Sequence, residues 1–311
     1  MEYVRLGTAG MKVSRLCLGT NMMGSYVDEK ASTELIHTFL ECGGNFIDTA
    51  DVYAQGASEE AIGKALKTHR HQAVVATKAY LPMGAGPNDR GTSRAHIMAA
   101  SEASLRRLQT DYIDLYILHY WDPDTPIEES LRAMDDLVRQ GKVRYVGVSN
   151  FAAWQVMRAV WAADKLGLEP VRSVQVQYSF LDRHPEEELF PVCVDQGLIL
   201  TPYWVLLAGM LTGKYERGQP PPEDSRMGRR PQAAERYLTD RNFNAAERLC
   251  AIAEESGRTP TELTLAWALS KPAIGSVIAG TSRPEQVKAN CEAVDVSLSD
   301  DTLAALDAVG A

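Results

Sequence analysis

Four polar residues of the chain have side chains that could act together on a carbonyl group: Asp48, Tyr53, Lys78 and His119. A carbonyl that accepts a hydride develops negative charge on oxygen, and an acid must then give up a proton. A phenol suits this task when an ammonium beside it favours its ionisation. We therefore predict that Tyr53 is the proton donor and that the Lys78 ammonium favours its ionisation. Asp48 would hold Lys78, and neutral His119 would orient the carbonyl by hydrogen bonding.

Each of these residues also has an ordinary structural interpretation. An aspartate at the end of a strand is often a turn former, and a lone lysine faces solvent. A lone histidine is more often a satisfied core residue, and a lone tyrosine packs under a loop. Taken singly, these interpretations are the better ones. Taken together, the four residue types describe one reaction, which favours the catalytic hypothesis.

The short apolar runs before Asp48, Lys78 and His119 belong to a repeating pattern of strands and helices. Eight such runs, each followed by helical periodicity, cover residues 15–19, 45–48, 73–78, 112–119, 143–149, 173–177, 198–202 and 276–279. Eight alternations favour a parallel sheet closed into a barrel, although an open doubly wound sheet has a similar local pattern. An open dinucleotide-binding sheet should carry G-x-G-x-x-G after an early strand, whereas residues 18–24 lack the second glycine. We predict an α/β fold, a (β/α)8 TIM barrel, with residues 1–311 as a single domain.

Other segments complete the expected architecture. Residues 3–6 and 12–14, with Gly-Thr-Ala-Gly between them, predict an N-terminal β-hairpin that could plug the bottom of the barrel. Residues 81–92 and 209–242 predict long loops on the active face, and such loops are often functional. One helix should begin with Thr125 as its cap, Pro126 in its first turn and Glu128 completing a capping box, and should end at Gly141.

Charge, termini and cysteines exclude several classes of protein. The net charge is −9 and no basic cluster could follow a phosphate backbone, so we expect no nucleic-acid partner. The first residues do not resemble a signal peptide, and Pro202 interrupts the apolar run near residues 199–211, so we expect a cytoplasmic protein without a membrane partner. The cysteines suggest no disulfide framework and no metal site, because they are odd in number and scattered. They are Cys17, Cys42, Cys193, Cys250 and Cys291.

The residues described so far resemble the aldo-keto reductase superfamily. The matching segments are residues 44–50 (GNFIDTA) with Tyr53, 76–78 (ATK), 114–119 (DLYILH), 147–151 (GVSNF), 211–215 (LTGKY) and 280–290. The resemblance spans nearly the whole chain and includes the Asp-Tyr-Lys-His tetrad of that family. It implies an NADP(H)-dependent oxidoreductase that reduces an aldehyde or ketone to an alcohol, with the reverse oxidation as a second direction.

The resemblance also implies a path for NADPH/NADP+ across the mouth of the barrel. It places Thr20 and Asn21 near the nicotinamide, Ser149, Asn150 and Gln175 on the carboxamide, Tyr203 on the ring, Leu206 and Lys214 along the pyrophosphate, and Ser282, Arg283, Gln286 and Asn290 at the adenosine and its 2′-phosphate, with Asp48 and Gly280 completing the set. Arg283 suits a phosphate, because a guanidinium presents fixed donors and a helix N-terminus favours anions. Taken alone, Arg283 is simply a charge before a helix.

The chain departs from the family pattern in the predicted cofactor path. Trp204 and Val205 occupy the positions where relatives commonly have Ser-Pro, so a hydroxyl donor is missing there. Ala289 occupies the position of a glutamate that contacts adenine in many relatives. Both changes bear on cofactor affinity.

Two other functions are compatible with the same residues. The first is an NADP(H)-binding regulatory subunit resembling the accessory subunits of potassium channels. The second is a Schiff-base aldolase that would use Lys78 as its nucleophile. The substrate itself is not specified, but aromatic residues beyond strand ends could form a mouth for a bulky or cyclic carbonyl, or pack under loops. They are Tyr26, Tyr80, Tyr120 and Trp121.

Overall fold

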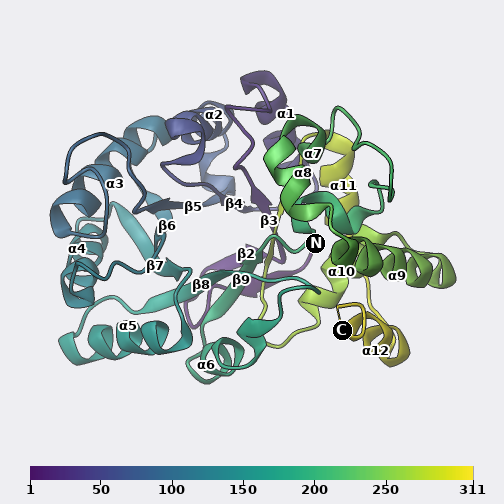
Figure 1. Ribbon diagram of the computed structural model, residues 1–311. Helices are drawn as coiled ribbons and strands as arrows, with labels where there is room; N and C mark the ends of the chain where they lie inside the picture. Colours follow the sequence, from purple (N-terminus) through teal and green to yellow (C-terminus); the bar gives the residue numbers. More distant parts are fainter. Residues whose placement is uncertain (311) are drawn as a thin grey trace.

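The computed structural model describes residues 1–310, and its centre is a barrel of parallel strands (Figure 1). The strands pair in the order β10-β3-β4-β5-β6-β7-β8-β9. The barrel closes where Leu200 N donates to Ala273 O (3.0 Å) and Gly275 N donates to Leu200 O (3.1 Å). The predicted (β/α)8 barrel is confirmed. Its strands are β3 (Leu16–Gly19), β4 (Phe46–Asp48), β5 (Val74–Ala79), β6 (Ile113–Leu118), β7 (Val143–Ser149), β8 (Val171–Gln177), β9 (Ile199–Tyr203) and β10 (Val277–Gly280).

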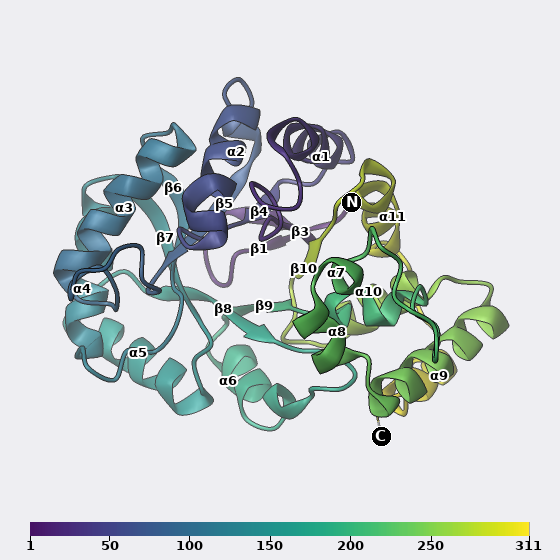
Figure 2. The ribbon, with the colours of Figure 1, turned by 45° about the horizontal axis from the view of Figure 1, so that its top comes forward.

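Helices surround the strands, as the view in Figure 2 shows. Helix α4 illustrates why they pack there: Ile127, Leu131, Met134 and Leu137 are all buried on one side. That spacing makes an apolar stripe along a helix, and the stripe faces the barrel. The helices are α1 (Glu29–Glu41), α2 (Ala57–Ala65), α3 (Arg94–Leu108), α4 (Ile127–Arg139), α5 (Ala153–Leu166), α6 (Leu189–Asp195), α7 (Arg226–Arg229), α8 (Pro231–Tyr237), α9 (Asp240–Ser256), α10 (Pro260–Leu269), α11 (Pro284–Ala293) and α12 (Asp300–Asp307).

The beginning of α4 differs from the prediction. Pro126 is the N-cap, and no side chain caps the helix. Thr125 Oγ1 instead donates to Asp122 Oδ2 (2.9 Å), and Glu128 binds Arg158 of α5 (2.7 Å). The predicted capping box is wrong, because both of its side chains find partners outside the helix.

The N-terminal hairpin is formed by β1 (Tyr3–Arg5) and β2 (Lys12–Ser14), which pair antiparallel. Leu6 and Val13 are fully buried in one apolar cluster with residues of the barrel strands, such as Phe46 and Leu115. Because Phe46 begins β4, this cluster fills the end of the barrel opposite the carboxyl ends of the strands. The hairpin therefore closes the barrel floor, as predicted.

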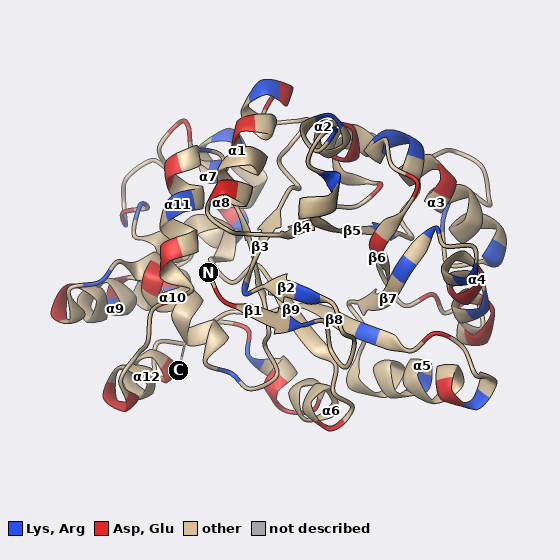
Figure 3. Cartoon of the chain, turned by 180° about the vertical axis from the view of Figure 1, so that it is seen from behind, with Lys and Arg blue, Asp and Glu red and all other residues tan. Residues whose placement is uncertain are grey.

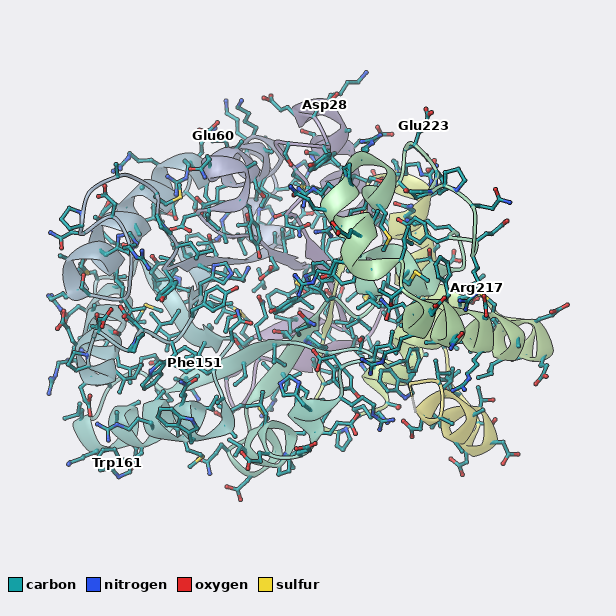
Figure 4. All side chains as sticks on the ribbon, in the orientation of Figure 1. Asp28, Glu60, Phe151, Trp161, Arg217 and Glu223 are labelled. Carbon is teal, nitrogen blue, oxygen red and sulfur yellow. The ribbon has the colours of Figure 1, made fainter. Side chains whose placement is uncertain are left out.

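The two long connections follow β5 and β9, so both leave the carboxyl ends of strands. Residues 81–92 contain no helix or strand, whereas residues 209–242 include α7 and α8. Arg217 fastens the second connection to α9 through Asp240 (2.5 Å) and Glu247 (2.9 Å; Figure 4). Both connections are thus placed to border a site at the mouth of the barrel.

The outer surface carries charges of both signs, and acidic and basic side chains are interspersed over the surrounding helices (Figure 3). Within residues 1–310, no helix has the length and apolar character needed to cross a membrane.

Candidate active site

The carboxyl ends of β4 and β5 bring the first three predicted residues together. Lys78 Nζ donates to Asp48 Oδ1 (2.7 Å), to Thr49 O (2.6 Å) and to the Tyr53 hydroxyl (3.3 Å). The Lys78 side chain is fully buried. An ammonium has three donors, so these acceptors use its whole hydrogen-bonding capacity. Lys78 is therefore held rigidly against Tyr53.

A strained turn carries Tyr53 to this position. The turn Tyr53–Gly56 contains three successive left-handed residues: Ala54 (φ 49°), Gln55 (φ 55°) and Gly56 (φ 94°). At Gly56 a Cβ atom would lie 2.6 Å from Arg107 Cδ, so both the backbone and the space there favour glycine. The Lys78 ammonium also lies 4.8 Å from the centre of the Tyr53 ring. The turn and the lysine together fix the orientation of the phenol.

Burial and charge act in opposite directions on the pKa values of Lys78 and Tyr53. Burial lowers the pKa of the Lys78 ammonium, but the charges of Asp48 and Tyr53 outweigh it and leave that pKa above its ordinary value. Burial raises the pKa of the Tyr53 phenol, and Lys78 offsets only part of the rise. Tyr53 is therefore a protonated phenol at neutral pH. Lys78 acts on its pKa in the expected direction, although burial dominates in this structure.

His119 directly follows β6 and faces the same site. Its ring centroid lies 6.1 Å from that of Tyr53, with 77° between the ring planes. Its Nδ1 is buried without a hydrogen-bond partner. Burial, together with the Lys78 charge, lowers the pKa of the His119 imidazole to about 3. The ring is therefore neutral, so that one ring nitrogen can donate a hydrogen bond and the other can accept one.

The residues expected at the nicotinamide carboxamide are connected to this group by hydrogen bonds. Gln175 Nε2 donates to Asp48 Oδ2 (2.9 Å), and Asn150 Nδ2 donates to His119 O (3.0 Å) and to Ser149 Oγ (3.1 Å). The adjoining Tyr203 hydroxyl donates to Asn150 Oδ1 (2.7 Å). The ends of β7, β8 and β9 thereby form one polar network around Asp48 and His119.

Thr20 and Asn21 follow β3, next to Asp48 in the barrel. Thr20 Oγ1 donates to Asp48 O (2.8 Å) and lies 2.8 Å from Ser58 Oγ. Its hydroxyl therefore supports the backbone of Asp48. Asn21 is half-buried and lies beside Gly280, whose strand pairs with β3 at Gly19.

Several cationic side chains gather around Lys214 and Arg283, the two residues that the resemblance assigns to phosphates. Burial and the charge of Arg283 lower the pKa of Lys214, although the Lys214 side chain still reaches solvent. Burial and the charge of Arg230 lower the pKa of Arg226 in the same region. The Arg283 guanidinium pairs loosely with the largely exposed carboxylate of Asp224, at 3.6 Å. In a chain of net charge −9, this local excess of positive charge fits a phosphorylated ligand.

The start of α11 carries the other residues expected at the adenosine. Arg283 is the N-cap of α11, no side chain caps its first turn, and Gln286 N donates to Arg283 O (3.1 Å). Gln286 Oε1 accepts from Ser282 N (3.0 Å) and Ser282 Oγ (3.4 Å). Asn290 is buried one helical turn further on. These residues lie together on α11 and the segment directly before it.

The segment that departs from the family pattern packs the long connection against the barrel. Trp204 has φ 63°, and its ring centroid lies 4.9 Å from that of Tyr237 in α8. The Arg226 guanidinium lies 4.9 Å from the Trp204 ring. Val205 is buried and Leu206 is half-buried beside it. The sequence pattern did not predict this packing role of Trp204, because its partners lie more than twenty residues away.

The four aromatic residues predicted around the mouth are not equivalent. Tyr120 stacks on His119 (5.2 Å) and contacts Tyr80 (5.5 Å), so these two tyrosines border the site. Tyr26 accepts a hydrogen bond from Arg230 (2.7 Å). Trp121 packs against Phe151, which is labelled in Figure 4, and against Trp154. Trp121 therefore packs between loops and α5, which was the alternative to a role at the mouth of the site.

A cavity of about 630 Å³ opens beside Asn150 and Tyr203. Gln177 and Asp182 also line it, whereas Asp48, Tyr53, Lys78 and His119 do not. The cavity therefore adjoins residues expected at the nicotinamide, but it does not reach the four predicted catalytic residues.

Asp51 and Glu59 form a buried acidic cluster that the sequence pattern did not predict. Glu59 accepts from Thr77 Oγ1 (2.5 Å) and pairs with Arg107 (2.6 Å). Asp51 is fully buried, and neither of its oxygens has a well-formed hydrogen bond. Burial and the charge of Glu59 raise the pKa of Asp51 to about 7. Its position between Asp48 and Tyr53 was the available signal.

A closed (β/α)8 barrel with a buried lysine, aspartate and tyrosine at its carboxyl-terminal mouth defines the class of this protein. The model of the Aldo/keto reductase family matches residues 15–311. The chain belongs to the aldo-keto reductase family, and relatives with oxidoreductase names are among its matches.

Similar proteins carry names of two kinds. A probable voltage-gated potassium channel beta subunit of Arabidopsis thaliana is 39% identical over 303 residues, covering 95% of this chain and 92% of the relative. The aldo-keto reductase YhdN of Bacillus subtilis is 35% identical over 301 residues, covering 94% and 88%. A protein of the same organism named uncharacterized oxidoreductase YrpG is 36% identical over 318 residues, covering 99% of this chain and 95% of the relative.

Proposed function

We propose that this protein is an NADP(H)-dependent carbonyl reductase in which residues 1–311 act as one domain. It reduces an aldehyde or ketone to an alcohol and also runs in the reverse direction. The observation that carries the proposal is the Lys78 ammonium, which binds Asp48 (2.7 Å) and the Tyr53 hydroxyl (3.3 Å) at once. Membership of the aldo-keto reductase family supports it.

In this mechanism Tyr53 gives its hydroxyl proton to the developing alkoxide. The Lys78 ammonium stabilises the phenolate that remains, and Asp48 keeps the ammonium in place. Neutral His119 donates a hydrogen bond that orients the carbonyl oxygen. The buried network leaves these groups little freedom, so little reorganisation is needed during the reaction.

NADPH, when bound, supplies the hydride. The positive charge of Lys214 and Arg283 favours a ligand with a 2′-phosphate, and this supports NADPH over NADH. The residues that would hold the cofactor are Thr20, Asn21, Asp48, Ser149, Asn150, Gln175, Tyr203, Leu206, Lys214, Gly280, Ser282, Arg283, Gln286 and Asn290.

The Schiff-base alternative is less well supported. A lysine nucleophile must lose its proton, whereas the charges of Asp48 and Tyr53 keep the pKa of Lys78 above its ordinary value. All three donors of Lys78 are also engaged. We therefore assign Lys78 to charge stabilisation.

A regulatory role is the second candidate function. Relatives named as potassium channel beta subunits, from Arabidopsis thaliana, rice and fission yeast, are 36–39% identical to this chain. Such a subunit would bind NADP(H) without rapid turnover. Stable association with a channel would favour this function.

A panel of aldehydes and ketones, assayed by the loss of NADPH absorbance, tests the proposal. The wild-type protein should turn over at least one class of carbonyl much faster than the matched Tyr53→Phe variant. If both proteins bind NADPH but neither reduces any carbonyl, the proposed carbonyl-reductase function is wrong and the regulatory function is favoured.

A further inference from the structure

A stripe of four exposed side chains runs along the outer face of α5. Trp154, Arg158, Trp161 and Lys165 follow one another at steps of four, three and four residues, a spacing that sets them in one line along a helix. The two tryptophans are 61% and 48% exposed. Figure 4 shows Trp161 at the outer edge of the molecule, on the side of α5 away from the barrel. Large aromatic side chains that share one line in water indicate a surface that another molecule covers.

The cations of this α5 stripe already lie against one of its aromatic rings. The Lys165 ammonium is 4.5 Å from the centre of the Trp161 ring, and the Arg158 guanidinium is 5.4 Å from it. Arg158 also pairs with Glu128 of α4 (2.7 Å), so its charge is locally balanced. These contacts restrict the long basic side chains before any partner binds, which lowers the entropy lost on binding.

The order of residues in the α5 stripe is self-complementary. When two copies of α5 pack antiparallel about a two-fold axis at the middle of the stripe, Trp154 of each copy faces Lys165 of the other, and Arg158 faces Trp161. Every aromatic ring then meets a cation, and the symmetry makes each contact twice. A parallel pair in register would instead oppose like residues, including Lys165 to Lys165. The stripe therefore fits an antiparallel copy of itself.

We propose that the α5 stripe binds a second copy of this chain through an antiparallel α5–α5 contact. A two-fold contact of this kind uses the same patch on both copies, so one stripe is enough to make a closed dimer. Tryptophan and arginine are residue types that are enriched in protein interfaces. The stripe shares no residue with the proposed active site, so the dimer does not depend on the proposed function.

Sedimentation velocity over a concentration series tests the dimer. The wild-type protein should show a reversible equilibrium between monomer and dimer. The decisive variants are Trp154→Lys and Trp154→Glu, because both remove the same ring and differ only in the charge that faces Lys165 of the other copy. Trp154→Lys opposes two cations at two symmetric places, so its dimer dissociation constant should exceed that of Trp154→Glu by about tenfold or more.

The overall charge of the chain predicts the opposite order for these two variants. Each copy carries a net charge of −9, so an added lysine would strengthen a non-specific association and an added glutamate would weaken it. Tyr3→Lys is the matched control, because Tyr3 is an exposed aromatic residue on β1, and it should leave the dissociation constant unchanged. A dimer that Trp154→Lys and Trp154→Glu weaken equally would overturn the proposal. A protein that stays monomeric at every concentration would also overturn it and would assign the stripe to a different partner.

Chemical cross-linking tests the antiparallel register. Trp154→Cys protein is mixed with Lys165→Cys protein and treated with a short bismaleimide. We expect a cross-linked dimer in the mixture and much less in either variant alone, because two copies of position 154 lie about 16 Å apart along the paired helices. Wild-type protein, which keeps the half-buried Cys42 and Cys250, controls for reaction at the native thiols. Cross-links that are as abundant in Trp154→Cys alone as in the mixture would contradict the antiparallel contact.

Discussion

The Lys78 ammonium and the Asp48 carboxylate form a buried ion pair, with 2.7 Å between Nζ and Oδ1. Gln175 binds the second oxygen of Asp48, and Thr49 and Tyr53 accept the remaining donors of Lys78. Removing one partner of such a pair leaves an uncompensated buried charge, which typically costs about 3–5 kcal/mol. The pair therefore couples the stability of the barrel to the position of Tyr53.

Tyr53→Phe removes the proton donor and keeps the ring. Because general acid catalysis typically contributes about 10²–10⁴-fold, turnover should fall by roughly that factor. NADPH binding should be retained, since the ring still fills its space. Steady-state rates, together with a titration of NADPH, check both parts. Near-normal turnover would mean that another group supplies the proton.

Lys78→Met should damage both activity and stability. It removes the charge that favours ionised Tyr53 and leaves Asp48 without its partner, so we expect a loss of about 3–5 kcal/mol in the free energy of unfolding. Urea denaturation and steady-state kinetics measure the two effects. Lys64→Met is the control, because Lys64 pairs with Glu29 on the surface, and it should leave both quantities nearly unchanged. A Lys78→Met variant as active as the wild type would show that the buried pair does not assist Tyr53.

The barrel and its reactive group could be predicted because both depend on local patterns. Apolar runs mark the strands, and polar residues at their carboxyl ends mark the site, since parallel strands in a barrel share one face. Asp48, Lys78 and His119 could therefore be placed together without knowledge of any contact.

Features that depend on which of several partners a side chain contacts could not be predicted. Thr125 looked like a helix cap, but its hydroxyl binds Asp122 within the preceding loop. Trp204 was interpreted as the loss of a hydroxyl donor, but its ring packs on α8.

His119 should not titrate in the working range of the enzyme. Burial and the Lys78 charge hold the pKa of its imidazole near 3, so the ring stays neutral between about pH 5 and pH 8. The profile of kcat/KM against pH should therefore have the same shape in wild type and in His119→Asn, although the variant should be slower throughout. An acid limb near pH 6 that is present only in the wild type would contradict a neutral His119.

Asp51→Asn should change stability in a pH-dependent way. Because the pKa of Asp51 is raised from 3.8 to about 7, the folded protein holds a proton that the unfolded chain releases. The wild type therefore loses stability as the pH rises through this window, by about 1.4 kcal/mol per pH unit. The amide cannot ionise, so the variant gains stability relative to wild type by about 2–3 kcal/mol more at pH 8 than at pH 5.

Urea denaturation at both pH values measures this difference. Asp164→Asn, at an exposed position of α5, controls for the general loss of a negative charge. A difference between Asp51→Asn and wild type that is the same at both pH values would mean that Asp51 does not hold a proton in the folded protein.

Arg283→Ala should separate the two nicotinamide cofactors. Arg283 is the N-cap of α11 and has only a loose contact with Asp224 (3.6 Å), so its guanidinium is available to a phosphate. A charge-assisted hydrogen bond contributes about 1.5–3 kcal/mol, which corresponds to roughly one to two decades in affinity. NADPH binding should weaken by that factor, whereas NADH binding should barely change because NADH lacks the 2′-phosphate.

Fluorescence titration of both cofactors measures this selectivity. Arg258→Ala is the matched control, because Arg258 also has a 3.6 Å contact with a carboxylate, that of Glu262, but lies before α10 and away from the start of α11. The control should bind both cofactors like the wild type. Equal losses for NADPH and NADH in Arg283→Ala would mean that the guanidinium supports the long connection of residues 209–242 or the adenosine. The preference for NADPH would then arise elsewhere.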